Sequence, residues 1–289
     1  MTVLFKRVVN VAIAPKLVGV AAAGLAGIVP GQAFDVSNLD CVFNVKKNLK
    51  PEPNTCELKI FNLAESTRKI LASAERLVLR LEAGYEGAIS QLYLGEVRSA
   101  HSTIEGPDIV TEISTGDSEK EVATTKISIP VGPKTPASAV MLQIIKELNV
   151  GPGNAPIMAG KMPPNVVAMF GNGTIITGKA ARALDDICRA ADYEWSIQDG
   201  VLQILDRGRA VEGLAVLLSP ETGLVGSPSV DQKGIVSATA LIQPDLRPGR
   251  KVVFKSKTFT GGGYRIEDCE YSGDTAGNEW YVKFHAKPY

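Results

Sequence analysis

Cysteine and histidine are both scarce in this chain of 289 residues. The cysteines form no C-x-x-C pair and are too few for a disulfide-held secreted scaffold; they are Cys41, Cys56, Cys188 and Cys269. We expect them to be buried free thiols, although an even number leaves two disulfides open. The histidines, His101 and His285, have no Cys or His neighbour at metal-ligand spacing, so we expect neither a zinc site nor another cofactor.

The chain also lacks a net charge, because 31 basic residues balance 31 acidic ones. A protein that binds nucleic acid or lies on an anionic membrane usually carries a basic excess. We therefore expect no specific nucleic-acid binding and no membrane partner. Local charged patches stay open.

No apolar run is long enough for a membrane helix. Lys6 and Arg7 precede an apolar stretch, as in a signal peptide, but three residues interrupt it: Asn10, Pro15 and Lys16. The unbroken piece, Leu17–Pro30, is shorter than the roughly 18 residues that a membrane helix needs. The small residues of Leu17–Gly31 favour a loop that packs closely against a partner.

The usual signatures of hydrolases are missing, since there is no G-x-S-x-G elbow and no H-E-x-x-H motif. Carboxylates do occur on expected strands, at Glu57, Asp108 and Glu112. A pair of them would suit acid–base chemistry, but the sequence does not place any two at the required separation. We expect them to lie on a solvated face, and we expect the protein not to be an enzyme.

One segment comes close to a phosphate-binding loop. The run GTIITGKA, from Gly173 to Ala180, nearly matches G-x-x-x-x-G-K-[ST] and would place Lys179 on phosphates. Ala180 stands where the hydroxyl residue that holds Mg²⁺ should be. The alternative that we favour is a turn in which Thr177 caps the following helix.

Short apolar runs with a period of two dominate what the chain does contain, among 28 glycines and 17 prolines. They predict strands at Val8–Ile13, Leu39–Val45, Cys56–Ile60, Leu77–Glu82 (ending at Gly84), Gln91–Val97, Asp108–Ile113 and Lys126–Ile129. A charged loop, Lys46–Asn54, joins two of these strands, and a short helix is expected over Glu65–Ala74. This number of strands favours a barrel or sandwich in residues 1–130.

The pattern then changes to a small α/β module in residues 131–205. Thr135 and Pro136 resemble the N-cap and first residue of a helix that ends near Gly151. A second helical stripe runs from Ala180 to Ala191. The hairpin EWSIQDGVLQIL follows, with Asp199-Gly200 as a type I′ turn.

Residues 206–289 read as β-structure again. The stretch Thr222–Ser256 predicts two strands joined by a rigid turn, and Trp280–Ala286 alternates regularly as a last strand. In the turn, Pro244, Pro248 and Gly249 favour a fixed corner with cations at its rim. The candidate subunit-contact residues are Arg247, Arg250 and Lys251 here, with Lys46 and Lys47 in the charged loop; the alternative is a solvated strand face.

Several segments together resemble tailed-phage baseplate hub proteins of the phage late control D-like family. An F-x-V-x-K strand leads to a P-N…I-x-N-L return, carried here by Phe43, Val45, Lys47, Pro53, Asn54, Ile60, Asn62 and Leu63. Further matching segments follow in the family's order: LRLEAGYEG, YLGEV, TGDSE, ETGLVGSPSV, LIQPDLRPGRKVVFKS and YSGDTAGNEWYVKFHAKPY. The resemblance spans essentially the whole chain.

The resemblance implies a fold that is mainly β, with two tube-type β-barrel or sandwich domains flanking, or interrupted by, the small α/β insert. Residues 206–289 would form the second barrel or complete the first. The implied function is a structural virion protein of the tail baseplate, a homotrimeric, pseudo-sixfold ring that joins the tail tube to the central spike. Its partners would be the tail tube protein, the spike, other baseplate proteins and the tape measure protein, with assembly in the cytoplasm of the bacterial host.

Two other functions stay open at this point. A tail-associated cell-wall hydrolase would need a carboxylate pair in a cleft of the α/β insert. A nucleotide-binding protein would need a working phosphate loop at Lys179.

Overall fold

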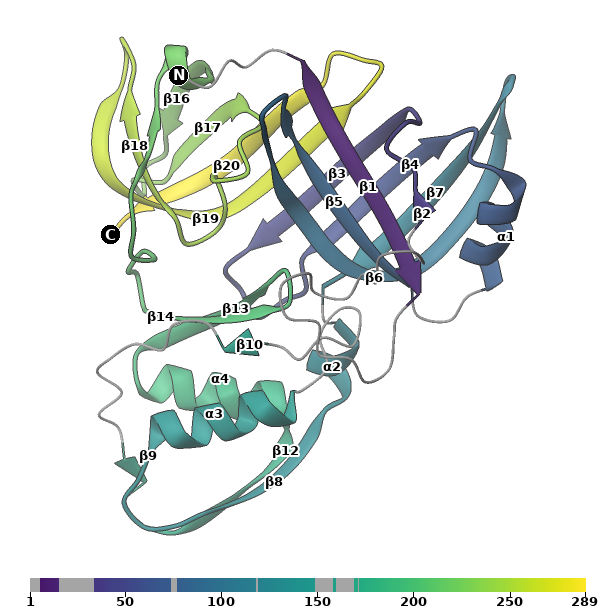
Figure 1. The fold of residues 1–289 in the computed structure, drawn as a ribbon. Helices are drawn as coiled ribbons and strands as arrows, with labels where there is room; N and C mark the ends of the chain where they lie inside the picture. Colours follow the sequence, from purple (N-terminus) through teal and green to yellow (C-terminus); the bar gives the residue numbers. More distant parts are fainter. Residues whose placement is uncertain are drawn as a thin grey trace.

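Strands dominate the computed structural model of the chain (Figure 1). The structure describes residues 6–15, 34–73, 77–117, 119–148, 158–159, 169–170 and 172–289. The segment Leu17–Gly31, for which we expected a loop packed on a partner, lies outside these residues. Within the part of the chain that is described, no helix is long and apolar enough to cross a membrane.

The described residues of the N-terminal β lobe form the elements β1 (Arg7–Pro15), β2 (Phe34–Asp35), β3 (Cys41–Asn48), β4 (Thr55–Phe61), α1 (Glu65–Ser73), β5 (Leu77–Tyr85), β6 (Ala88–Glu105), β7 (Asp108–Gly116) and α2 (Glu119–Thr124). In β4 the inward residues Cys56, Leu58 and Ile60 are buried and alternate with polar neighbours. This alternation lets one face of the sheet cover the core while the other meets water.

The α/β insert follows. It contains β8 (Lys126–Val131), β9 (Thr135–Pro136), α3 (Ala137–Glu147), β10 (Met158–Ala159), β11 (Met169–Phe170), β12 (Thr174–Lys179), α4 (Ala180–Ala190), β13 (Tyr193–Gln198) and β14 (Val201–Asp206). Its core is separate from that of the β lobes: buried residues of α3 and α4, such as Ile144 and Leu184, pack with Trp195 of β13. Strand β8 pairs with β12, and its Ile127 and Ile129 belong to this core.

The C-terminal β lobe comprises β15 (Val216–Leu218), the 3₁₀ helix η2 (Pro220–Thr222), β16 (Leu224–Val230), β17 (Val236–Leu241), β18 (Lys251–Lys255), β19 (Thr260–Asp274) and β20 (Trp280–Pro288). Most neighbouring strands here are antiparallel, and β15 pairs with β18 in parallel. Alternating residues of β20, from Trp280 to Ala286, are buried.

One sheet runs through both β lobes in the order β16-β17-β20-β19-β3-β4-β7-β6-β5-β1-β2. The lobes meet where β19 pairs with β3, over a register from Asp268 opposite Asn48 to Asp274 opposite Val42. Buried apolar residues of both lobes form a single cluster, in which Phe43 of β3 meets Trp280 of β20 at a ring-centroid distance of 5.8 Å. The two lobes are therefore one mechanical unit, with the insert attached below them in Figure 1.

The prediction of a mainly β fold with a small α/β insert is confirmed, and most expected elements lie within a few residues of the observed ones. The Asp199-Gly200 turn has the positive φ angles, 55° and 80°, that a type I′ hairpin requires. Strand β5 does not stop at Gly84 but continues to Tyr85, and β6 is far longer than Gln91–Val97.

The predicted start of helix α3 is wrong. Thr135 is not the N-cap of α3: it lies in β9, its hydroxyl donates to the Gly132 carbonyl at 2.7 Å, and Pro136 is the N-cap residue. The two strands expected in Thr222–Ser256 are present as β17 and β18, but they pair with other strands and not with each other: β17 lies between β16 and β20, while β18 lies between β15 and β19.

Candidate interface surfaces

The corner between β17 and β18 is held in one conformation by backbone hydrogen bonds. The Leu246 amide donates to the Gln243 carbonyl at 3.0 Å, and the Arg250 amide donates to the Arg247 carbonyl at 3.1 Å. The buried hydroxyl of Tyr271 donates to the Leu246 carbonyl at 2.8 Å. The expected rigid turn is thus present, and it fixes the positions of the basic side chains at its rim.

Among the described residues, the cations of this corner have only weak partners. Arg247 and Arg250 each lie 3.7–3.8 Å from the exposed carboxylate of Asp245. Lys251 stands over the ring of Tyr289, 5.5 Å from its centroid. Ion pairs this long and exposed contribute little to stability, so the described residues compensate the positive charge of this corner only weakly.

The other two candidate residues differ sharply from each other, although they are adjacent. Both lie in strand β3, so the expectation that they belong to the charged loop Lys46–Asn54 is wrong. Lys46 points to solvent and forms a loose pair with Glu270 at 3.5 Å. Lys47 is buried and its ammonium group lies 2.6 Å and 2.8 Å from the two carboxylate oxygens of Asp199. Lys47 therefore holds the insert on the β lobes and has no free charge to offer a neighbouring subunit.

Asp199 receives more than this one contact. The turn of the β13–β14 hairpin inserts against the sheet, where the amide of Leu94 donates to the Asp199 carboxylate at 3.1 Å. Beside it, the Asn54 side chain donates to the Ile197 carbonyl at 2.9 Å, and Gln198 donates to the Asn48 carbonyl at 2.7 Å. The hairpin tip is thus held on the N-terminal lobe by an ion pair and several hydrogen bonds.

A second buried cation joins the insert to the C-terminal lobe. Arg265 of β19 pairs with Glu194 of β13, and its guanidinium also donates to Glu267 at 2.8 Å and to the Arg209 carbonyl at 3.0 Å. Sequence reasoning missed this role, because nothing local connects Arg265 to residues more than fifty positions away. Together with Lys47 it attaches the insert to both β lobes.

The segment GTIITGKA is not a phosphate-binding loop. Its residues form the extended strand β12, paired with β8, so its amides are not gathered around an anion. Thr177 does not cap helix α4; the N-cap residue is Lys179, whose side chain makes no capping hydrogen bond. The single glycine with a positive φ here, Gly178 at 115°, allows the change of direction into the helix.

One of the strand carboxylates, Glu112, is neutralised on a solvated face. Glu112 lies 2.5 Å from the ammonium of Lys59 and 3.0 Å from Nε2 of His101. The hydrogen bond from Lys59 lowers the pKa of Glu112, so this carboxyl is a poor proton donor near neutral pH. The described residues contain no cluster of His, Cys, Asp and Glu that would hold a metal ion.

All four cysteines are free and buried, as the sequence predicts. Burial raises the pKa of the Cys41 thiol from 9.0 to about 11, and that of Cys188 and Cys269 to about 12. A raised pKa means that the folded state holds the neutral thiol, while the unfolded chain ionises at lower pH.

We expect the native protein to react with no equivalent of an aromatic disulfide reagent at mildly alkaline pH, and with four equivalents in denaturant, because the thiols are inaccessible and protonated. Rapid labelling of the folded protein would contradict this prediction.

The contribution of Cys41 to the free energy of unfolding should be complete below pH 9 and disappear as pH rises to about 11.

The comparisons with known proteins decide the family. The sequence model of the family described as baseplate hub gp41 matches residues 29–286. The chain belongs to this baseplate hub family. No curated protein matches it by sequence. The prediction of a tailed-phage baseplate hub is confirmed, and the protein is a structural component of the tail baseplate of a virion.

Solved structures show that the hub shares its fold with tail proteins. A 43 kDa tail protein of prophage MuSo2 from Shewanella oneidensis has a TM-score of 0.62 at 8% identity, covering 98% of this chain and 97% of that one. A tail protein from Neisseria meningitidis has a TM-score of 0.64 at 9% identity, with the same coverage of 98% and 97%.

A type VI secretion component from Escherichia coli, described as similar to the T4 phage tail proteins gp27 and gp5, has a TM-score of 0.59 at 11% identity. The match covers 92% of this hub and 76% of that chain. At such identities the likeness establishes the fold alone.

Proposed function

We propose that this hub assembles as a homotrimer whose three copies form a pseudo-sixfold ring between the tail tube and the central spike. The observation that supports it most is that each chain carries two β lobes joined through the β3–β19 pairing. Three such chains would present six β lobes, which matches a threefold spike to a sixfold tube. The family and the tail-protein fold support a structural role rather than an enzymatic one.

The proposed neighbours are the tail tube protein, the central spike, other baseplate proteins and the tape measure protein, with assembly in the host cytoplasm. We further propose the division into an N-terminal β domain, an α/β insert and a C-terminal β domain. Because β8 pairs with β12 and contributes to the insert core, the first boundary fits better before Lys126 than after residue 130.

The mass of the purified hub in solution tests the trimer. Three copies of the 30.7 kDa chain would give about 92 kDa by native mass spectrometry or light scattering. A particle of that mass with threefold symmetry in electron micrographs would support the ring. A protein that stays monomeric at all concentrations, and that is absent from purified tails, would overturn it.

The basic corner provides a second test. Replacing Arg247 and Arg250 together by glutamate should impair ring formation by about tenfold or more in assembly constant, because charge reversal at a rim opposes an acidic partner surface. With the residues that the structure describes, both side chains form only long ion pairs, so the monomer should stay folded. The matched control is Lys255→Glu with Lys257→Glu, which makes the same charge change on exposed residues beyond the corner.

The measurements are the assembly constant from sedimentation and the melting temperature of each variant. Unchanged assembly in the corner variant would show that these arginines belong to a solvated face. Equal loss in both double variants would show a general charge effect instead of a contact at the corner.

A further inference from the structure

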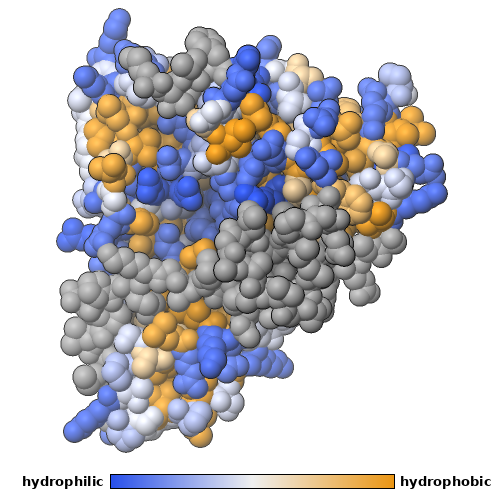
Figure 2. Space-filling model, viewed as in Figure 1, coloured by the Kyte–Doolittle hydropathy of each residue, from blue (hydrophilic) through white to orange (hydrophobic). Residues whose placement is uncertain are grey.

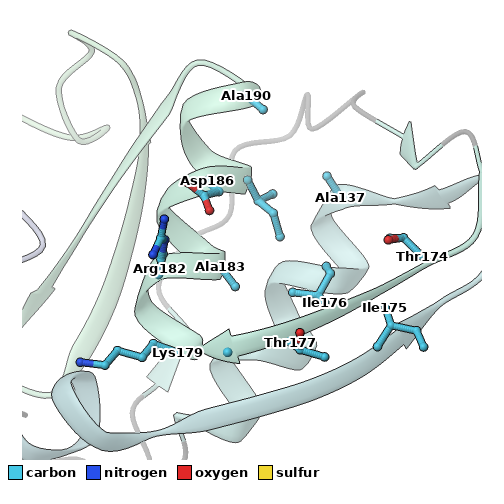
Figure 3. Close-up of a pocket in the computed structure, with 12 residues that line it drawn as sticks. Ala137, Thr174, Ile175, Ile176, Thr177, Lys179, Arg182, Ala183, Asp186 and Ala190 are labelled. Atoms are coloured by element: carbon cyan, nitrogen blue, oxygen red, sulfur yellow. The ribbon is translucent and has the colours of Figure 1, made fainter.

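An apolar groove with a volume of about 780 Å³ runs along the insert between β12 and α4 (Figure 3). Its apolar lining is formed by Ala137, Ile175, Ile176, Ala183, Ile187 and Ala190. Ile175 keeps 66% of its surface exposed, which is unusual for an isoleucine in the middle of a strand. Figure 2 shows that apolar residues also reach the surface over the insert on the face drawn there. Exposed apolar surface of this kind marks a docking site.

The groove is bordered by the edge of β12 and not by one of its faces. Side chains of a strand alternate between faces, yet every residue from Thr174 to Lys179 lines the groove. Among the described strands, β12 pairs only with β8, so its other edge has backbone groups available for a further strand. The site is therefore shaped for an extended segment, with hydrogen bonds along one side and apolar contacts along the other.

One end of the groove is basic. Lys179 and Arg182 are both exposed there, at the start of α4, and neither forms an ion pair with another described residue. Asp186 lies one turn further along α4 and is the one carboxylate among the described lining residues. A segment that fills the groove should accordingly carry an acidic residue beside an apolar one, with the acid at the Lys179 end.

The hub itself carries such a segment at the tip of the β6–β7 hairpin. Ile104 is 80% exposed, and Glu105 follows it at the turn. Strand β5 pairs with β6 only up to Glu96, so the part of β6 beyond it pairs with β7 alone among the described strands. Helix α1 contacts β6 but leaves Ile104 uncovered. The tip thus offers a free strand edge, an apolar side chain and an acid.

The tip and the groove cannot meet within one chain. In Figure 1 the β6–β7 hairpin projects from the N-terminal lobe, while β12 lies at the far side of the insert. A contact between them must join two copies, and it would be a head-to-tail contact because the two surfaces differ. Head-to-tail contacts close into rings when the rotation between copies allows it.

We propose that the β6–β7 hairpin tip of one hub subunit docks in the groove between β12 and α4 of the next subunit. Ile104 fills the apolar groove beside Ile175, and Glu105 pairs with Lys179 and Arg182. This contact rests on the proposed trimeric ring and adds to it the surfaces that hold adjacent subunits together.

Disulfide trapping tests the contact directly, since all four native cysteines are buried. Ile104→Cys and Ile175→Cys are made as separate proteins, assembled together and oxidised, and the products are separated on a non-reducing gel. A covalent dimer should form in the mixture and not in either protein alone. A trimer by mass without the mixed dimer would overturn the docking contact and leave the ring standing. A protein that remains monomeric would overturn both.

Charge reversal gives an independent readout. Lys179→Glu with Arg182→Glu, added to the Ile175→Cys protein, should lower the yield of the mixed dimer by about tenfold or more, since like charges then face each other. Glu105→Lys, added to the Ile104→Cys protein, should restore most of that yield. The control, Lys146→Glu on the exposed face of α3, should have no effect. Loss without recovery would show that Glu105 does not meet these cations.

Discussion

Replacing Lys47 by methionine is expected to lower the free energy of unfolding by roughly 3–5 kcal/mol. The Lys47 ammonium lies between both carboxylate oxygens of Asp199, and its side chain is 3% exposed while that of Asp199 is 12% exposed. Removing the lysine leaves the Asp199 carboxylate in a poorly hydrated site with only the Leu94 amide as a described donor. A buried charge without a partner destabilises the folded state by more than an intact buried pair stabilises it.

The neighbouring residue provides the matched control. Lys46 lies on the same strand and pairs with Glu270 at 3.5 Å, but its side chain is 63% exposed. Lys46→Met should change the free energy of unfolding by less than about 1 kcal/mol, because exposed ion pairs are worth little. The double variant Lys47→Met with Asp199→Asn should recover part of the loss, since it removes the unpaired charge and asparagine tolerates the positive φ at this turn.

Denaturant unfolding followed by circular dichroism gives the free energy of unfolding of the unmodified hub and of the three variants. Because Lys47 holds the insert, its loss should also increase proteolysis at the junction between the insert and the β lobes. Equal effects of the Lys46 and Lys47 variants would contradict the assignment of Lys47 to the junction.

The sequence contains a signal for Lys47 that the loop assignment overlooked. The inward positions of β3 are Cys41, Phe43 and Val45, and the next residue of that period is Lys47. A lysine at an inward position requires an acidic partner, so strict alternation indicates a buried pair. The partner could not be found this way, because Asp199 lies 152 positions further along the chain.

Local sequence patterns predicted where the strands and turns lie much better than which strands pair with each other. Period-two runs located β4, β7 and β20, and the Asp-Gly pair located the β13–β14 turn, because these signals are contained within a few residues. The pairing of β3 with β19 has no local signal, since those strands are more than 200 residues apart. The outer half of β6 was missed for another reason: most of its residues are polar and exposed, and among the described strands pairing with β7 alone makes them a strand.

The second large effect concerns the seam between the two β lobes, where Phe43 packs over Gly273. Phe43→Ala is expected to cost roughly 3–5 kcal/mol of unfolding free energy, because the ring is 1% exposed and its loss leaves a cavity beside Trp280. A side chain at Gly273 would overlap the Phe43 ring, so Gly273→Ala should cost about 1–3 kcal/mol by overpacking.

The double variant tests whether contact with the Phe43 ring is the reason that position 273 must be glycine. If the Phe43 ring alone makes Gly273 necessary, Gly273→Ala should cost almost nothing in the Phe43→Ala background, and the two losses should not add. The control on the same strand is Gly262→Ala, whose added methyl meets Val253 only at ordinary contact distance, 3.7 Å. Denaturant unfolding of the single and double variants gives the coupling energy. Additive losses at Phe43 and Gly273 would show that the glycine is required for another reason. A strong coupling would show that the close packing of the Phe43 ring on Gly273, across β3 and β19, is what both losses have in common.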